Sequence, residues 1–219
     1  MSLMLQTMRD SGGNCSLIDI GGNIGFYTLA AARAGFWVDV FEPVPLNAAM
    51  IGASLERNRF KNVRLHTSAL GDGTHVELGM GRSSNNQGGV KHEGGTTSST
   101  MLPSLRFDDI PSFSRKRGGT FYLKIDIEGG ECSALRGMKD FISRVRIVGV
   151  NMEWVNAKKC CKELSSDGQV FHMFWKRHGL CPQGTTFESL CSYPHWDLVW
   201  KSCSKTRQAY TVGRGGNVG

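Results

Sequence analysis

The stretch LIDIGGNIGFYTLAAA, from Leu17 to Ala32, constrains the fold more than any other part of this chain. It begins as an apolar run, passes through three glycines and continues with apolar residues at helical spacing. A tight glycine turn between a strand and a helix lets the backbone approach a ligand and directs helix N–H groups towards it. The stretch therefore predicts the first βα unit of a nucleotide-binding α/β sheet.

Further apolar runs alternate with helical stretches along the chain, which favours a largely parallel sheet with helices on both faces. The helix after the first strand is expected to place Phe26, Leu29 and Ala30 on one face. The expected strands cover residues 16–20, 37–41, 62–70, 121–127, 146–154 and 195–202, and the other expected helices cover 45–58, 132–138 and 165–178.

The length of 219 residues is sufficient for one sizeable domain, which we expect over residues 1–212. Residues 79–100 are nearly all Gly, Ser, Thr and Asn, and this composition predicts a flexible loop. Such a loop is either an inert insertion or a mobile lid over a substrate. The last residues, 213–219, read GRGGNVG and predict a disordered tail.

The charge and the apolar pattern limit the expected partners. The net charge of +7 favours anionic partners, but the basic residues are scattered and are not interleaved with aromatic residues as in a stacking surface for nucleic acid. Nucleic acid is therefore not the expected partner. No apolar run approaches the ~20 residues that span a bilayer, and the first residues lack the apolar core of a secretory signal. We expect a cytoplasmic protein without a membrane span, and its oligomeric state is left open.

The seven cysteines contain no C-x-x-C pair, so a zinc site of the usual spacing is not expected. Reduced thiols in a reducing compartment are the simplest interpretation. Alternatively Cys181, Cys191 and Cys203 pair with one another if the protein is exported.

The glycine loop reads GGNIG over residues 21–25 and departs from the G-x-G-x-x-G pattern of dinucleotide-binding folds. Asn23 stands where the second glycine would let the backbone approach a pyrophosphate. Asp19 is also poorly placed beside a pyrophosphate but well placed for a cationic group such as an α-ammonium. S-adenosylmethionine carries that group and a sulfonium and has no phosphate, so the loop favours it over NAD.

Glu42 follows the second expected strand, 23 residues after Asp19. An acid at that strand end can accept hydrogen bonds from both ribose hydroxyls. Since folds that bind a ribose in this way share this feature, Glu42 supports a ribose without identifying the cofactor.

The segment LKIDIEGGECSALRG, from Leu123 to Gly137, is rich in acids. Asp126, Glu128 and Glu131 lie where the expected fourth strand ends and the next helix begins, and ligands of open α/β sheets bind at that edge. Close carboxylates raise one another's pKa, which leaves one of them able to act as a base. They could equally hold a divalent metal, although no residue pattern specifically indicates one, and Glu131 could instead cap the helix.

Five motifs, in this order, resemble those of FkbM-type methyltransferases: DIGGNIGFYTL, FEPVPLN, SALGDG, RFDDI and LKIDIEGGECSALRG. The resemblance covers about Leu17 to Trp154. It implies a Rossmann-like class I methyltransferase that uses S-adenosylmethionine, with a mostly parallel seven-stranded sheet whose last strand is antiparallel. The cofactor contacts that it implies are Asp19, Gly21, Gly22, Asn23, Gly25 and Glu42, with Ser68 and Ala69 against the adenine.

Family members mostly methylate hydroxyl oxygens, so the expected acceptor is a small molecule, a sugar or a lipid. We expect Asp126 to lie nearest the methyl-transfer site, with Glu128 and Glu131 as further candidates for base or metal ligand. Lys124 shares a strand face with Asp126 and is expected to form an ion pair with it, and Glu153 ends the next strand at the same edge.

Three alternatives remain open at this stage. A nucleic-acid methyltransferase is supported only by the basic charge, because the chain contains no polar-Pro-Pro-aromatic tetrad. An NAD-dependent dehydrogenase conflicts with Asp19 and Asn23. A catalytically weak relic that only binds the cofactor is the third, because 15 residues precede the first expected strand, fewer than family members usually have.

Overall fold

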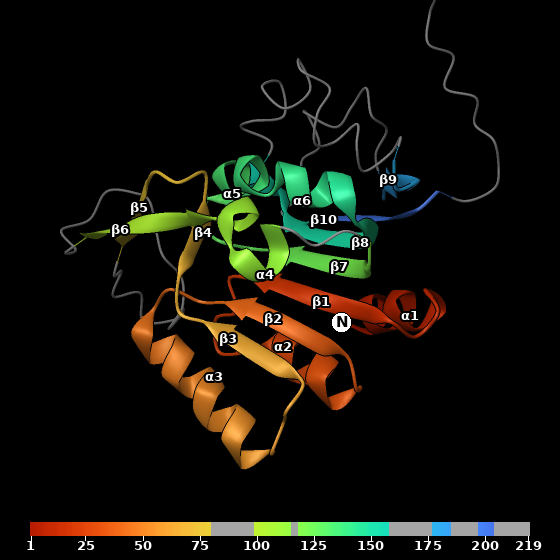
Figure 1. The fold of residues 1–219 in the computed structure, drawn as a ribbon, viewed down its shortest axis with the longest axis horizontal. Helices are drawn as coiled ribbons and strands as arrows, with labels where there is room; N and C mark the ends of the chain where they lie inside the picture. Colours follow the sequence, from red (N-terminus) through yellow and green to blue (C-terminus); the bar gives the residue numbers. More distant parts are fainter. Residues whose placement is uncertain (80–98, 115–117, 158–176, 185–196, 204–219) are drawn as a thin grey trace, which may run out of the picture.

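The computed structural model of the chain describes residues 1–79, 99–114, 118–157, 177–184 and 197–203 (Figure 1). At its centre is a seven-stranded sheet in the order β3-β2-β1-β7-β8-β10-β9. β10 is antiparallel to both of its neighbours, whereas β3, β2, β1, β7 and β8 are parallel to one another. The predicted Rossmann-like sheet with one antiparallel strand is therefore confirmed. The strands are β1 (Cys15–Ile20), β2 (Trp37–Phe41), β3 (Val63–His66), β7 (Thr120–Ile125), β8 (Arg146–Glu153), β9 (Leu180–Pro182) and β10 (Asp197–Ser202).

Helices cover both faces of the sheet, and neighbouring residues of each central strand alternate between two apolar cores. On β1, Leu17 packs in one core with Met8 and Ile51, and Ile18 packs in the other core with Phe141. The first face carries α1 (Ser2–Asp10), α2 (Phe26–Arg33) and α3 (Pro45–Arg57). The second face carries α4 (Pro111–Ser114), α5 (Glu131–Gly137), α6 (Lys139–Arg144) and α7 (Trp154–Ala157).

A second, three-stranded sheet lies beyond the carboxyl ends of the parallel strands (Figure 1). It contains β4 (Ala69–Gly71), β5 (His75–Gly79) and β6 (Ser99–Arg106), and a short 3₁₀ helix, η1 (Phe107–Asp109), follows β6. The single strand expected over 62–70 is therefore wrong. The chain leaves the main sheet after β3, and β4 pairs in parallel with the end of β6.

The local predictions differ from the structure in two helices. The buried face of α2 is Thr28, Ala31 and Ala32, whereas Phe26 is 67% exposed. Helix α1 was not expected, yet its Met4 and Met8 are buried against the sheet. In both helices, packing against the sheet determines which side chains are buried. The sequence of a short helix indicates its buried face poorly, because most of its stability comes from tertiary packing.

Some expectations concern residues outside the described ranges. These are residues 80–98 of the predicted loop, 165–176 of the predicted last helix and the predicted tail 213–219. The extent of the single domain therefore stays a prediction.

Cys181 and Cys203 form a disulfide, with 5.0 Å between their Cα atoms, which joins β9 to the residue after β10. Cys132 is also disulfide-bonded, whereas Cys15 is a buried free thiol. The interpretation that the cysteines are reduced is thus wrong for Cys132, Cys181 and Cys203. The alternative, that the late cysteines pair with one another, is right for Cys181 and Cys203. Since disulfides are typical of oxidising compartments, the cytoplasmic location stays a prediction. Within the described ranges, no helix combines the length and the apolar character needed to cross a membrane.

Candidate active site

The glycine turn after β1 is held by the neighbouring strand and by the loop that follows β7. The amides of Gly21 and Gly22 donate to the Phe41 carbonyl oxygen at 2.9 and 3.1 Å. Gly21 has a φ of +83°, and a Cβ there would lie 1.9 Å from the backbone oxygen of Asp126. Only glycine satisfies both conditions, so this residue brings the end of β1 into direct contact with the end of β7.

Asp19 is fully buried beneath this turn. Its Oδ2 accepts a hydrogen bond of 2.6 Å from the Thr28 hydroxyl on α2. Its Oδ1 is buried without a hydrogen-bond donor among the described residues, and the Lys124 ammonium lies 3.4 Å away as an ion pair. A buried carboxylate oxygen without a donor is costly unless something donates to it, so Asp19 fits a ligand that carries a cationic N–H group.

The strand register places Asp19, Lys124 and Asn151 side by side across β1, β7 and β8. The Lys124 side chain is 6% exposed, and its Nζ donates to the Gly21 carbonyl oxygen and lies 3.7 Å from Asp126 Oδ2. Burial alone would lower the pKa of Lys124, but the carboxylates of Asp19 and Asp126 outweigh it and raise this pKa above its usual value. Lys124 is therefore a charged ammonium at neutral pH.

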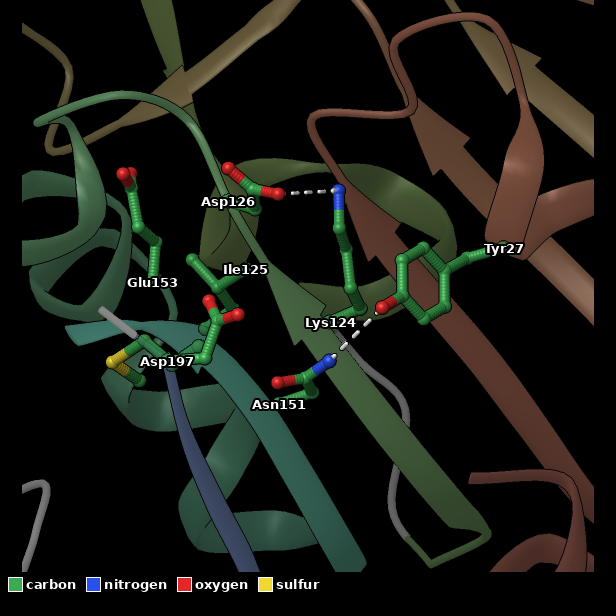
Figure 2. A pocket seen from close by; sticks show the side chains of 8 residues that line it. Tyr27, Lys124, Ile125, Asp126, Asn151, Glu153 and Asp197 are labelled. Atoms are coloured by element: carbon green, nitrogen blue, oxygen red, sulfur yellow. Dashed lines mark hydrogen bonds and ion pairs between the residues drawn. The ribbon is translucent and has the colours of Figure 1, made fainter. Parts of the chain in front are cut away.

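Lys124, Asp126 and Asn151 line a hollow at the carboxyl end of β7 and β8 (Figure 2). The Tyr27 ring closes one side, with its centroid 5.6 Å from Lys124 Nζ, and the Asn151 amide donates to the Tyr27 hydroxyl at 3.5 Å. The complete lining is Tyr27, Lys124, Ile125, Asp126, Asn151, Met152, Glu153 and Asp197. Sequence reasoning had selected Lys124, Asp126 and Glu153 but not the others.

Asp197 is the acid that sequence reasoning missed. It begins β10 and pairs with Glu153, the last residue of β8. Burial raises the pKa of Asp197, and the nearby Asp126 charge raises it further. The available signal was the orientation of the expected strand 195–202: in an antiparallel strand the first residue, not the last, lies at this edge of the sheet.

Glu42 lies beside the glycine turn, where the sequence predicted it. Its Oε2 accepts a hydrogen bond of 2.7 Å from the Asn23 amide, and its Oε1 accepts one of 2.9 Å from the Val44 amide. Burial raises the pKa of Glu42, and these hydrogen bonds counteract the rise. The carboxylate thus ties the turn to the start of α3, and its contact with a ribose stays a prediction.

Glu131 is fully buried at the first position of α5 and does not line the hollow. Its carboxylate accepts hydrogen bonds from the amides of Ile127 at 3.0 Å and Gly129 at 3.0 and 3.2 Å. Burial raises its pKa to about 7, and the Glu153 charge contributes to this rise. In this structure Glu131 stabilises the loop after β7, because its partners are loop amides that precede α5, and its part in catalysis or in helix capping stays a prediction.

Asp126, Glu128 and Glu153 can each offer an oxygen, and these atoms all lie within 4.8 Å of one another. This spacing is compatible with oxygen coordination of a divalent cation, but exposed acids also gather without one. Ser68 lies between β3 and β4 and Ala69 is the first residue of β4, and their contact with an adenine stays a prediction.

Residues 19–173 match the sequence profile of the methyltransferase FkbM domain, which is more than half of the chain. The chain belongs to the FkbM methyltransferase domain family. The match begins at the buried Asp19 and contains the glycine turn, Glu42 and the acids after β7. β9 and β10, with Asp197, lie beyond it, so the hollow combines residues of the FkbM domain with one acid from outside the matched region.

Solved structures share the fold at low sequence identity. A Streptococcus mutans protein described as a methyltransferase and solved in complex with SAH (S-adenosylhomocysteine) is 11% identical, with a TM-score of 0.50 over 92% of this chain and 97% of that one. The N-terminal domain of human METTL16 in complex with SAH is 15% identical, with a TM-score of 0.47 over 93% of this chain and 68% of that one. Precorrin-6y C5,15-methyltransferase from Geobacter metallireducens is 12% identical, with a TM-score of 0.46 over 91% and 84%. No curated protein sequence matches this FkbM-family chain.

Proposed function

We propose that this chain transfers a methyl group from S-adenosylmethionine to a hydroxyl oxygen of a small-molecule, sugar or lipid acceptor. Membership of the FkbM methyltransferase domain family supports methyl transfer. The observation that carries the cofactor assignment is the buried Asp19 Oδ1 without a hydrogen-bond donor, directly below the glycine turn. A cationic ammonium satisfies this oxygen, whereas a pyrophosphate would be repelled by it.

The residues proposed to hold the cofactor surround the turn and the ends of β2 and β3. When bound, S-adenosylmethionine supplies an electrophilic methyl group. Asp19 binds the ammonium, the turn lets the backbone approach the ligand, and Glu42 accepts from ribose hydroxyls after exchanging one of its amide donors. The proposed contacts are Asp19, Gly21, Gly22, Asn23, Gly25, Glu42, Ser68 and Ala69.

The acceptor hydroxyl is proposed to lie over Asp126, whose side chain is 48% exposed at the mouth of the hollow. Asp126 orients the hydroxyl, and alignment of reacting groups can supply ~7–11 kcal/mol of a barrier. Glu128 lies close enough to Asp126 to accept the hydroxyl proton, a contribution of ~10²–10⁴-fold. We assign Glu131 a structural role because backbone amides occupy its carboxylate.

Two measurements test this function. Titration calorimetry with SAH and with NADH should show binding of SAH alone, and binding of NADH alone would overturn the cofactor assignment. Radiolabelled methyl donor should then label glycan, lipid or small-molecule fractions as methyl ethers. Label in nucleic acid only, or no label in any fraction despite tight SAH binding, would replace this proposal by one of the alternatives.

A further inference from the structure

We propose that Lys124 binds the carboxylate of the cofactor's amino-acid end while Asp19 binds its ammonium. This inference rests on the proposed function, since it concerns how the same cofactor is held. It makes Lys124 a cofactor-binding residue rather than only an ion-pair partner of Asp126.

Lys124 retains donors for a ligand. An ammonium has three N–H groups, and one of them is directed to the Gly21 carbonyl oxygen. The oxygens of Asp19 and Asp126 lie 3.4 and 3.7 Å from Nζ, longer than the 2.7–3.2 Å of a full hydrogen bond. The ammonium is therefore held in place mainly by charge and keeps hydrogen-bonding capacity.

The side chain also reaches the space where a ligand would lie. Lys124 lines the hollow beside Tyr27 and Asn151, and Figure 2 shows its ammonium at the top of that space, directed towards Asp126. Its register partner Asp19 lies on the adjacent strand beneath the glycine turn. A fixed cation, Lys124 Nζ, therefore lies 3.4 Å from a fixed anion, Asp19 Oδ1.

An α-amino acid carries an ammonium and a carboxylate on the same carbon atom, so an adjacent acid and base form its charge complement. A free anion would gain little here, because Asp126 and Asp197 place further carboxylates around Lys124. A zwitterion brings its own cation for Asp19, and the attraction between them offsets part of this repulsion. The arrangement thus favours a ligand that carries both charges over one that carries a single charge.

A purely structural role for Lys124 makes a different prediction. If Lys124 only neutralises Asp19 and supports the turn, its loss weakens every ligand of the turn equally. If it binds the ligand carboxylate, its loss weakens only ligands that have one.

The test compares SAH with its decarboxylated analogue, 5′-(3-aminopropylthio)-5′-deoxyadenosine, which keeps the ammonium. In calorimetry the wild-type chain should bind SAH about 10- to 100-fold more tightly, as expected for a hydrogen bond between charged groups. Lys124→Met should abolish this preference. Lys61→Met, at an exposed residue shortly before β3, is the matched control and should keep this preference. A preference that survives in Lys124→Met, or one that is absent from the wild type, overturns the inference.

A second measurement requires no folded Lys124→Met variant. In ¹⁵N spectra of lysine ammonium groups of the wild-type chain, SAH should shift the Lys124 signal strongly and the analogue should leave it nearly unchanged. The signal is assigned by its absence from Lys124→Arg. Equal shifts with both ligands would overturn the inference, whereas a wild-type chain that binds neither ligand would overturn the proposed function.

Discussion

Asp126 contributes a half-exposed carboxylate at the mouth of the hollow, and the Lys124 ammonium forms an ion pair with it at 3.7 Å. We expect Asp126→Asn to reduce methyl transfer at least 100-fold, because a neutral amide orients the acceptor hydroxyl less strongly than a carboxylate does. The fold should persist, since the side chain is 48% exposed and carries no core packing. Initial rates with the labelled donor measure the first effect, and urea unfolding measures the second.

The matched control is Asp109→Asn, whose side chain is 73% exposed on η1. It should retain full activity. Equal activity of Asp126→Asn and the wild type would remove Asp126 from the mechanism.

Glu131 makes the stability of the chain depend on pH. Its folded-state pKa of about 7 exceeds the ordinary value of 4.5, so the folded state binds more protons than the unfolded state between these values. The free energy of unfolding should therefore fall as pH rises from about 4.5 to about 7. The pKa difference corresponds to a loss of up to about 3 kcal/mol above pH 7.

In Glu131→Gln this group no longer titrates, so the decrease in stability from pH 5 to pH 8 should be smaller by up to about 3 kcal/mol. Urea unfolding at the two pH values measures it, with the exposed Glu56→Gln on α3 as the control. A Glu131→Gln variant with the same pH dependence as the wild type would contradict the assignment.

The turn between β1 and α2 is the local element on which the site depends most. Gly21→Ala would combine a φ of +83° with a Cβ at 1.9 Å from the Asp126 backbone oxygen. We expect a loss of at least about 2 kcal/mol in the free energy of unfolding, together with lost SAH binding. Chemical denaturation and calorimetry measure the two effects.

Gly52→Ala tests the opposite case within α3. A Cβ at Gly52 meets nothing within 4 Å, and the residue lies in the helix interior. Alanine should stabilise the chain by about 0.5–1 kcal/mol and leave SAH binding unchanged. If both glycine variants behave alike, the special role of the turn is wrong.

At the scale of the whole molecule, the three-residue strand β9 forms one edge of the main sheet. The Cys181–Cys203 disulfide joins this strand to the residue that follows β10. The loop spans 22 residues, so Cys181→Ser with Cys203→Ser should lower the free energy of unfolding by about 3 kcal/mol. Because β10 carries Asp197 into the hollow, SAH binding and stability should be compared in the same variant. Alkylation followed by mass spectrometry checks the bond, and rapid labelling of both thiols in the purified chain would contradict it.

The amino-acid sequence predicted most strands of the main sheet, and three of the eight residues that line the hollow: Lys124, Asp126 and Glu153. Continuous apolar runs predict the bounds of β1, β2 and β8 to within one or two residues. They do so because a strand buried on both faces needs apolar residues throughout. Asp19, Glu42 and Asp126 were predicted at the correct edge, since acids that directly follow or interrupt such runs lie at strand ends.

The other features depend on contacts between parts of the chain that are distant in the sequence. The pairing of Lys124 with Asp19 depends on the register between strands that lie 105 residues apart in the sequence, and the place of Asp197 depends on the reversed direction of β10. The hydrogen bonds that occupy Glu131, the burial of α1 and the division of the third strand likewise come from packing partners. A local pattern records which residues prefer burial and a given backbone shape, but contacts between distant segments are settled only when the whole sheet has formed.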